Sequence, residues 1–263
     1  MPTFRQSRET RSAGPWLRHL PAKRLLEAIE IEAATLLAVA ERDLSAPVPT
    51  CPGWTVADVL EHVAEVYQHK IACTRSGRRP DTWPPDFGDH EPIPFLVVSL
   101  AELLTELGGR DPESPAYTWY PPDQTVHFWC RRMAHETIVH RVDVQSAFDD
   151  VTPVGDDELA IDGIDEILDL FLVWSLGEDP DEHVGGDGRT VAIRAGGHVW
   201  RVTLEKETLR LDRSAGPAEL TVSGEPSELM LWLWRRRPTS AVTVDGDLEL
   251  VPVFRELLGR ATQ

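Results

Sequence analysis

The stretch His135-Glu-Thr-Ile-Val-His-Arg-Val-Asp143 lies inside a run of apolar and ionisable residues that predicts a helix over about 125–148. Glu136 and His140 are four positions apart, so on a helix their side chains lie one above the other on the same face. Burying so many ionisable groups is costly unless they are paired or bind a metal. The stretch therefore predicts either a pair of metal ligands or a surface ladder of ion pairs in which Arg132 joins Glu136.

A second helix, predicted from Thr55 to about Ser76, carries another histidine in an apolar pattern, at the end of Trp54-Thr-Val-Ala-Asp-Val-Leu-Glu-His62. Two helical ligands need a third, and His62 is the best candidate. His69 competes with it, because seven residues bring the chain back to roughly the same face. Two histidines and one carboxylate suit zinc or another first-row divalent cation with one coordination position open.

Asp143 follows His140 by three positions on the same predicted helix. A carboxylate there can accept a hydrogen bond from the ring nitrogen of a metal-bound histidine and so orient it. A salt bridge from Asp143 to Arg141 or another cation is the alternative.

Two more amphipathic helices are predicted, over about 21–43 and 94–108, with Pro- and Gly-rich connections between the four. Four helices of which the second and fourth carry inward His and Glu describe a four-helix bundle, which we expect to run up and down. The connection over 77–94 is long for a bundle, and loops of that length often form the wall or lid of a site.

Beyond about residue 150 the apolar pattern changes from a helical period to a period of two. A fifth helix is predicted over 156–176, with short helices over 225–235 and 248–258. The predicted strands cover 190–194, 199–204, 208–212, 219–223 and 241–245. We therefore expect an α+β protein with a flexible arm at 1–20, a helical bundle at 21–152 and a small domain at 153–263 whose sheet is mostly antiparallel.

Composition narrows the class of partner. The net charge of −18 disfavours nucleic acid and anionic membrane surfaces, because both are bound by clustered Lys and Arg. Three widely spaced cysteines make no disulfide framework. With no signal peptide or apolar run of membrane-spanning length, we expect a cytoplasmic protein, either a monomer or a homodimer.

The motifs Pro52-Gly-Trp-Thr-Val-Ala-Asp-Val-Leu-Glu-His62 and His135-Glu-Thr-Ile-Val-His-Arg-Val-Asp143 resemble those of the mycothiol-dependent maleylpyruvate isomerase family of actinobacteria. That family belongs to the wider group of DinB-like metal-binding bundles. The stretch 220–235, which reads LTVSGEPSELMLWLWR, is similar to the family's sterol-carrier-like second domain. The resemblance covers about residues 20–260.

The resemblance implies a metal site of His62, Glu136 and His140. It also implies that the metal, for which zinc is the first candidate, binds the thiolate of mycothiol, a small thiol that acts as co-substrate. In the isomerase this thiolate adds to the double bond of maleylpyruvate, allows rotation, and leaves to give fumarylpyruvate. Other relatives transfer a thiol to an electrophile.

The family is also thought to use arginines of the second domain to hold the anionic substrate. Arg235 and Arg237 are named here as candidate catalytic residues together with Asp143, and Arg236 and Arg201 are further possibilities. The family's pattern has a glycine before a single arginine, whereas this chain has three arginines in a row. A basic cluster that faces the helix dipole is the alternative explanation.

Three functions follow as hypotheses. The first is a metal- and thiol-dependent isomerase or thiol transferase that acts on a small electrophile such as maleylpyruvate. The second is a metal-dependent hydrolase that uses metal-bound water, with Glu65 or His69 as base. The third is a non-catalytic module that binds a small molecule and holds a structural metal, with Trp232 and Trp234 providing apolar surface.

Overall fold

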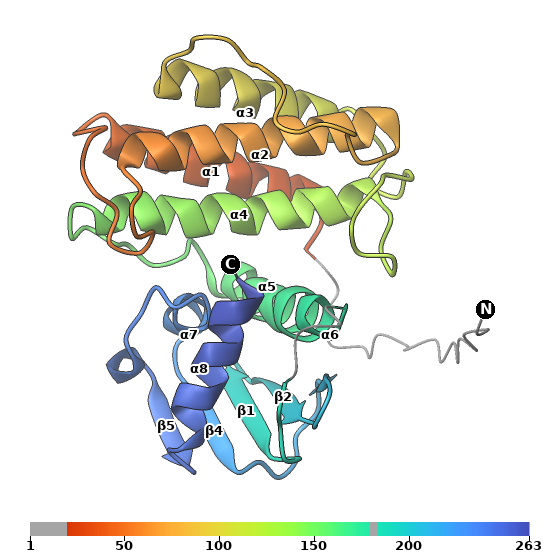
Figure 1. The fold of residues 1–263 in the computed structure, drawn as a ribbon, viewed down its shortest axis with the longest axis vertical. Helices are drawn as coiled ribbons and strands as arrows, with labels where there is room; N and C mark the ends of the chain where they lie inside the picture. The colour runs from red at the N-terminus through yellow and green to blue at the C-terminus, as the bar shows by residue number, and fades with distance from the viewer. Residues whose placement is uncertain (1–19, 179–183, 263) are drawn as a thin grey trace.

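The computed structural model describes residues 20–178 and 184–262. The predicted arm at 1–20 lies outside this part of the chain except for Leu20. A helical domain and an α+β domain follow one another along the sequence, and the helical domain forms the upper part of the molecule in Figure 1.

The predicted four-helix bundle is confirmed. Its helices are α1 (Ala22–Ala40), α2 (Val56–Ser76), α3 (Pro92–Gly108) and α4 (Val126–Ser146). Apolar residues from all four helices form the core between them. Helix α4 is buried on nearly every side, including at its ionisable residues. It is therefore the element that lies between the rest of the bundle and the second domain (Figure 1).

The direction of α3 corrects the expectation of an up-and-down bundle. The Gln68 side chain of α2 donates to Ser99 and Glu102 in the middle of α3, whereas Arg75, later in α2, pairs with Glu106 near the end of α3. Helices α2 and α3 therefore run parallel. The long connection over 77–91 makes this possible, because the chain must cross the length of the bundle between two parallel helices.

Helix α2 begins where its sequence predicts. The Thr55 hydroxyl accepts from the Asp58 backbone N–H, and the Asp58 carboxylate accepts from the Thr55 N–H at 2.7 Å, which together make a capping box. The helix ends at Gly77 in the left-handed conformation that favours glycine. These two signals place His62 near the end of the second turn of a well-defined helix.

The fifth helical segment changes its hydrogen bonding along its length. It begins as α5 (Asp157–Glu166), continues as a π-helix, η1 (Ile167–Ser175), and ends in the short α6 (Leu176–Glu178). The sequence predicted a single helix over 156–176. Helix α5 lies between the bundle and the sheet (Figure 1).

The five predicted strands form one sheet in the order β3-β2-β1-β4-β5. They are β1 (Thr190–Ala195), β2 (His198–Leu204), β3 (Leu209–Asp212), β4 (Leu220–Ser223) and β5 (Thr243–Gly246). Only β1 and β4 pair in parallel, so the sheet is mostly antiparallel as expected. Helices α7 (Pro226–Leu233) and α8 (Leu250–Ala261) and the short 3₁₀ turn η2 (Thr239–Ala241) complete the domain.

Trp232 and Trp234 differ from their expected role. Trp232 is fully buried and Trp234 is 6% exposed, so both belong to the core and offer little apolar surface to a ligand. None of the helices in the described residues is long and apolar enough to cross a membrane.

Candidate metal centre

The structure brings His62, Glu136 and His140 together. His62 Nε2 lies 3.3 Å from Glu136 Oε1, and His140 Nε2 lies 3.4 Å from the same oxygen. One candidate ligand atom from each side chain lies within 4.8 Å of the others. The arrangement depends on the antiparallel course of α2 and α4, which also pairs Tyr67 with Thr137 beneath the site.

These spacings fit a bound divalent cation. Ligands held tetrahedrally at about 2.0–2.1 Å from zinc lie roughly 3.3 Å from one another. The two imidazole-to-carboxylate distances have this value. Two imidazole nitrogens and one carboxylate oxygen also form a donor set typical of zinc and other first-row divalent metals.

The electrostatics of the site favour positive charge. Burial would raise the pKa of Glu136, but bonds with His140 and His62 and the charge of Arg132 outweigh it and hold this pKa well below its usual value. Burial would lower the pKa of His140, but Asp143 and Glu136 raise it to about 9. A carboxylate that attracts two imidazoles in this way can equally attract a metal ion.

Asp143 supports His140 from the side opposite the triad. His140 Nδ1 lies 3.1 Å from Asp143 Oδ2, while Nε2 faces Glu136. The Asp143 side chain is fully buried, and Arg236 donates to it through Nε and Nη2, both at 2.9 Å. The Thr50 hydroxyl donates at 2.6 Å. Burial would raise the pKa of Asp143, but the hydrogen bonds and charges of His140 and Arg236 keep it well below its usual value.

A second group of potential ligands, Cys51, His140 and Asp143, is a poorer cation site. Burial and the nearby charge of Asp143 raise the pKa of Cys51 to about 12, so its thiol stays protonated. The guanidinium of Arg236 lies 3.9 Å from the sulfur and already occupies Asp143. A cation placed there would meet this positive charge.

Arg132 lies behind Glu136 and is only 2% exposed, which excludes the predicted surface ladder. Its Nη2 donates to Glu136 Oε2 at 2.8 Å, and Nη1 donates to Glu166 of α5. The guanidinium also lies over the rings of Phe171 and Trp234, at 4.9 and 5.7 Å from their centroids. The sequence shows the spacing of Arg132 and Glu136 but not the covering residues that make this pair buried.

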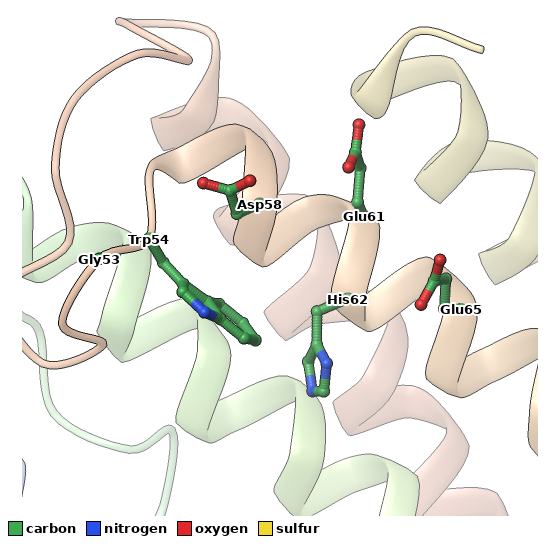
Figure 2. A pocket seen from close by; sticks show the side chains of 6 residues that line it. All are labelled: Gly53, Trp54, Asp58, Glu61, His62 and Glu65. Atoms are coloured by element: carbon green, nitrogen blue, oxygen red, sulfur yellow. The ribbon is translucent and has the colours of Figure 1, made fainter. Parts of the chain in front are cut away.

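His62 is the member of the triad that lines a pocket of about 400 Å³, together with Gly53, Trp54, Asp58, Glu61 and Glu65. Figure 2 shows the His62 imidazole and the Trp54 indole pointing the same way, toward α4, while the carboxylates of Glu61 and Glu65 point away from the imidazole. The rings of Trp54 and His62 lie 5.1 Å apart. Trp54 therefore forms a wall beside the exposed edge of the triad.

The arginine run is divided by the end of α7. Arg235 N–H donates to Trp232 O and Arg236 N–H donates to Leu231 O, which is a Schellman motif with Arg235 in the left-handed position, at φ 64°. Arg235 takes the place at which helices usually carry glycine. The next residue, Arg236, is the one that turns toward Asp143.

The other predicted residues lie elsewhere. Arg235 is exposed, with its guanidinium against Gly259, and Arg237 pairs with Glu228 at 2.9 Å. Arg201 pairs with Asp212 at 2.7 Å. The structure thus brings Asp143 to the triad but neither of the two arginines named with it.

His69 lies in a separate cluster two turns along α2. Its Nδ1 is 3.1 Å from Lys70 Nζ, and its ring packs edge-on against Trp83 at 4.9 Å. Lys70 in turn lies over the rings of Trp119 and Trp129. The choice of His62 over His69 as the third member of the triad therefore agrees with the geometry.

Family models match both domains of the chain. Residues 25–145 match the family model described as "Mycothiol maleylpyruvate isomerase N-terminal domain". Residues 158–252 match the "MDMPI C-terminal domain". The sequence shows no match among proteins of curated function.

The fold is similar to a solved structure of a mycothiol-dependent maleylpyruvate isomerase. The TM-score is 0.59 at 15% sequence identity, over 87% of this chain and 95% of that one. A histidine-to-alanine mutant of such an isomerase gives a TM-score of 0.60 with the same identity and coverage.

Proposed function

The chain belongs to the mycothiol-dependent maleylpyruvate isomerase family, and from this premise we propose that it is a metal- and thiol-dependent enzyme acting on a small electrophile. The observation that carries the proposal is the meeting of His62, Glu136 and His140 around one point, with His62 also lining a pocket. The co-substrate is mycothiol or a thiol of the same class, and the reaction is isomerisation or thiol transfer.

In this proposal His62, Glu136 and His140 hold a divalent cation, with zinc the first candidate. The ion supplies positive charge that lowers the pKa of a thiol in the open position. Asp143 fixes the His140 ring so that Nε2 faces the ligand position. Trp54 shields one side of that position from water.

The isomerisation needs neither an oxidant nor a reductant. A thiolate adds to one carbon of the double bond, and the electron pair of that bond moves onto the conjugated carbonyl as an enolate. Rotation then occurs about what has become a single bond. Return of the electron pair re-forms the double bond in the trans geometry and expels the thiolate.

The two alternative hypotheses have less support from the geometry. For a hydrolase, Glu65 points away from the His62 imidazole, and His69 lies in the cluster with Lys70 and Trp83. For a non-catalytic module, the tryptophans of the second domain are buried. A coordination shell completed by a fourth protein ligand would have favoured a structural metal, but among the described residues this group has three members, and one of them, His62, lines a pocket.

The test combines metal content with thiol dependence. Wild type, His140→Ala and the matched control His69→Ala are purified, loaded with zinc and assayed with mycothiol and maleylpyruvate, then with a panel of other electrophiles. We expect one equivalent of metal and thiol-dependent turnover in wild type and His69→Ala, and neither in His140→Ala. Metal-loaded wild type that turns over no electrophile with any thiol would overturn the proposal.

A further inference from the structure

We propose that the second domain sets the geometry of the metal ligands through two arginines, the buried Arg132 and the largely buried Arg236, which act as positioning residues. Each guanidinium binds one carboxylate at the triad while being held by residues of the second domain. The proposal rests on the metal site of the proposed function. It assigns to Arg236 a role different from contact with an anionic substrate.

Arg236 links the second domain to His140. It follows α7 directly, in the turn that places Arg235 in the left-handed conformation. Its Nε and Nη2 donate to the two oxygens of the Asp143 carboxylate, and its Nη1 donates to Trp234 O at 2.8 Å. Asp143 in turn lies 3.1 Å from His140 Nδ1. The orientation of the imidazole is thus transmitted from residue 236 through a single carboxylate.

Arg132 links the second domain to Glu136 in the same way. One nitrogen donates to Glu136, another to Glu166, and the guanidinium faces Phe171 and Trp234. The last three residues all lie within the region that matches the second-domain model. Arg132 itself belongs to α4, so the second domain acts here by enclosing it.

Both guanidinium groups are already hydrogen-bonded to carboxylates of the protein, which argues against a contact of either arginine with the substrate. A fork-shaped pair of hydrogen bonds to a buried carboxylate is among the strongest that an arginine makes. Opening it to bind a substrate would leave Asp143, which is fully buried, without its main counter-charge. The same holds for Arg132, which is 2% exposed.

The two carboxylates that these arginines bind lie two helical turns apart. Glu136 and Asp143 are separated by seven residues of α4, so their side chains lie on one face. Holding both carboxylates fixes the rotation and the tilt of α4 relative to the second domain. Ligand positions must hold within about 0.5 Å for tight metal binding, which a single contact would not ensure.

The first measurement is zinc affinity by competition with a chelator, on Arg236→Ala, Arg236→Lys and the matched control Arg237→Ala. Loss of a group that orients a ligand weakens metal binding by about 10–100-fold. We expect that loss in Arg236→Ala, a smaller one in Arg236→Lys, and less than a twofold change in Arg237→Ala. Thermal unfolding of each variant checks that it is folded.

Further variants separate positioning from substrate binding. If Arg236 acts through Asp143, Arg236→Ala adds little to the loss of affinity already caused by Asp143→Asn. Arg132→Lys is expected to alter the visible spectrum of bound cobalt, because it changes the position of Glu136. Unchanged zinc affinity in Arg236→Ala, together with a raised KM for an anionic electrophile, would overturn the proposal.

A readout without metal distinguishes this inference from the proposed function. In the metal-free protein, the Nδ1 proton of His140 is expected to give a downfield resonance in wild type that is lost in Arg236→Ala and kept in Arg237→Ala. If wild type binds no metal, the proposed function fails while this comparison still decides the role of Arg236. A resonance that persists in Arg236→Ala would contradict that role.

Discussion

A single carboxylate oxygen, Glu136 Oε1, is the point on which the candidate site converges. Both imidazoles of the triad approach it at 3.3–3.4 Å, and the other oxygen of the same carboxylate accepts from Arg132. The carboxylate therefore has one oxygen facing the ligand position and one facing the protein. The Glu136 side chain can therefore be a metal ligand through one oxygen while the other oxygen holds it in a fixed position.

Glu136→Gln tests this at the scale of one residue. The substitution keeps the shape of the side chain but replaces a charged ligand with a neutral amide. We expect zinc affinity to fall by more than the roughly 100-fold that loss of an outer partner costs. Isothermal titration calorimetry measures the change, and Glu65→Gln, whose side chain points away from His62, is the control. Equal affinity in the two variants would remove Glu136 from the site.

At the scale of elements, the end of α7 decides which arginine reaches the site. Arg235 occupies the left-handed position of the Schellman motif, where a residue with a Cβ is strained by about 1 kcal/mol relative to glycine. The residue that follows this turn, Arg236, contacts Asp143. The strain at Arg235 lowers the stability of the protein, whereas the contact between Arg236 and Asp143 is kept.

Arg235→Gly should therefore stabilise the protein. Relief of the strain is worth about 1 kcal/mol, which raises the melting temperature by roughly 2–4 °C. Differential scanning calorimetry measures the change. Arg237→Gly is the matched control, and it should bring no gain because it removes the pair with Glu228 without relieving a positive φ. A lower melting temperature for Arg235→Gly would mean that its contact with Gly259 matters more than the strain.

The cluster around His69 on α2 predicts a pH dependence. Burial, with the charges of Lys70 and Arg79, lowers the pKa of His69 to about 4, from the 6.5 of an unperturbed histidine. The unfolded chain therefore binds a proton in the range where the folded chain does not. Stability from this group is complete above pH 6.5 and is lost as the pH falls toward 4.

His69→Gln should remove part of this loss. Because the ring is partly exposed, the expected difference between wild type and variant at pH 4 is discounted to about 1 kcal/mol. Urea unfolding at a series of pH values from 7 to 4 measures it, and NMR titration of the ring gives the pKa directly. The same loss of stability in both proteins would show that His69 titrates normally.

On the scale of the whole molecule, an ion network joins the bundle to the second domain. Arg131 of α4 donates to Asp162 at 2.8 Å and reaches Asp165 at 3.4 Å, both on α5. Asp165 also accepts from Arg213 and from the indole of Trp200 in the sheet domain. Three layers of the molecule thus meet at one buried carboxylate.

Asp165→Ala should destabilise the protein by about 2–3 kcal/mol, because it takes one partner from each of Arg131 and Arg213 and leaves the buried indole N–H of Trp200 without its acceptor. Asp169→Ala is the control, since this residue also pairs with Arg213 but is 29% exposed, and it should cost about 1 kcal/mol or less. Guanidinium unfolding measures both. Similar costs for the two variants would mean that the network does not hold the domains together.

The amino-acid sequence by itself determined the helices, the strands and the spacing of the candidate ligands. These depend on interactions within a few residues of one another: the apolar period, the Thr55 capping box, and the four-residue step between Glu136 and His140. They also led to the family, because the two motifs are local. The choice of His62 followed from the pattern of a single helix.

Only the tertiary structure decided the direction of α3, the burial of Arg132, and which of three consecutive arginines reaches Asp143. Arg236 and Asp143 are 93 positions apart in the chain, so no local pattern relates them. Their contact depends on how the two domains pack and on the left-handed turn at Arg235. A pattern in sequence specifies which face a side chain occupies on its own helix, whereas its partner across an interface is set by the packing of the whole molecule.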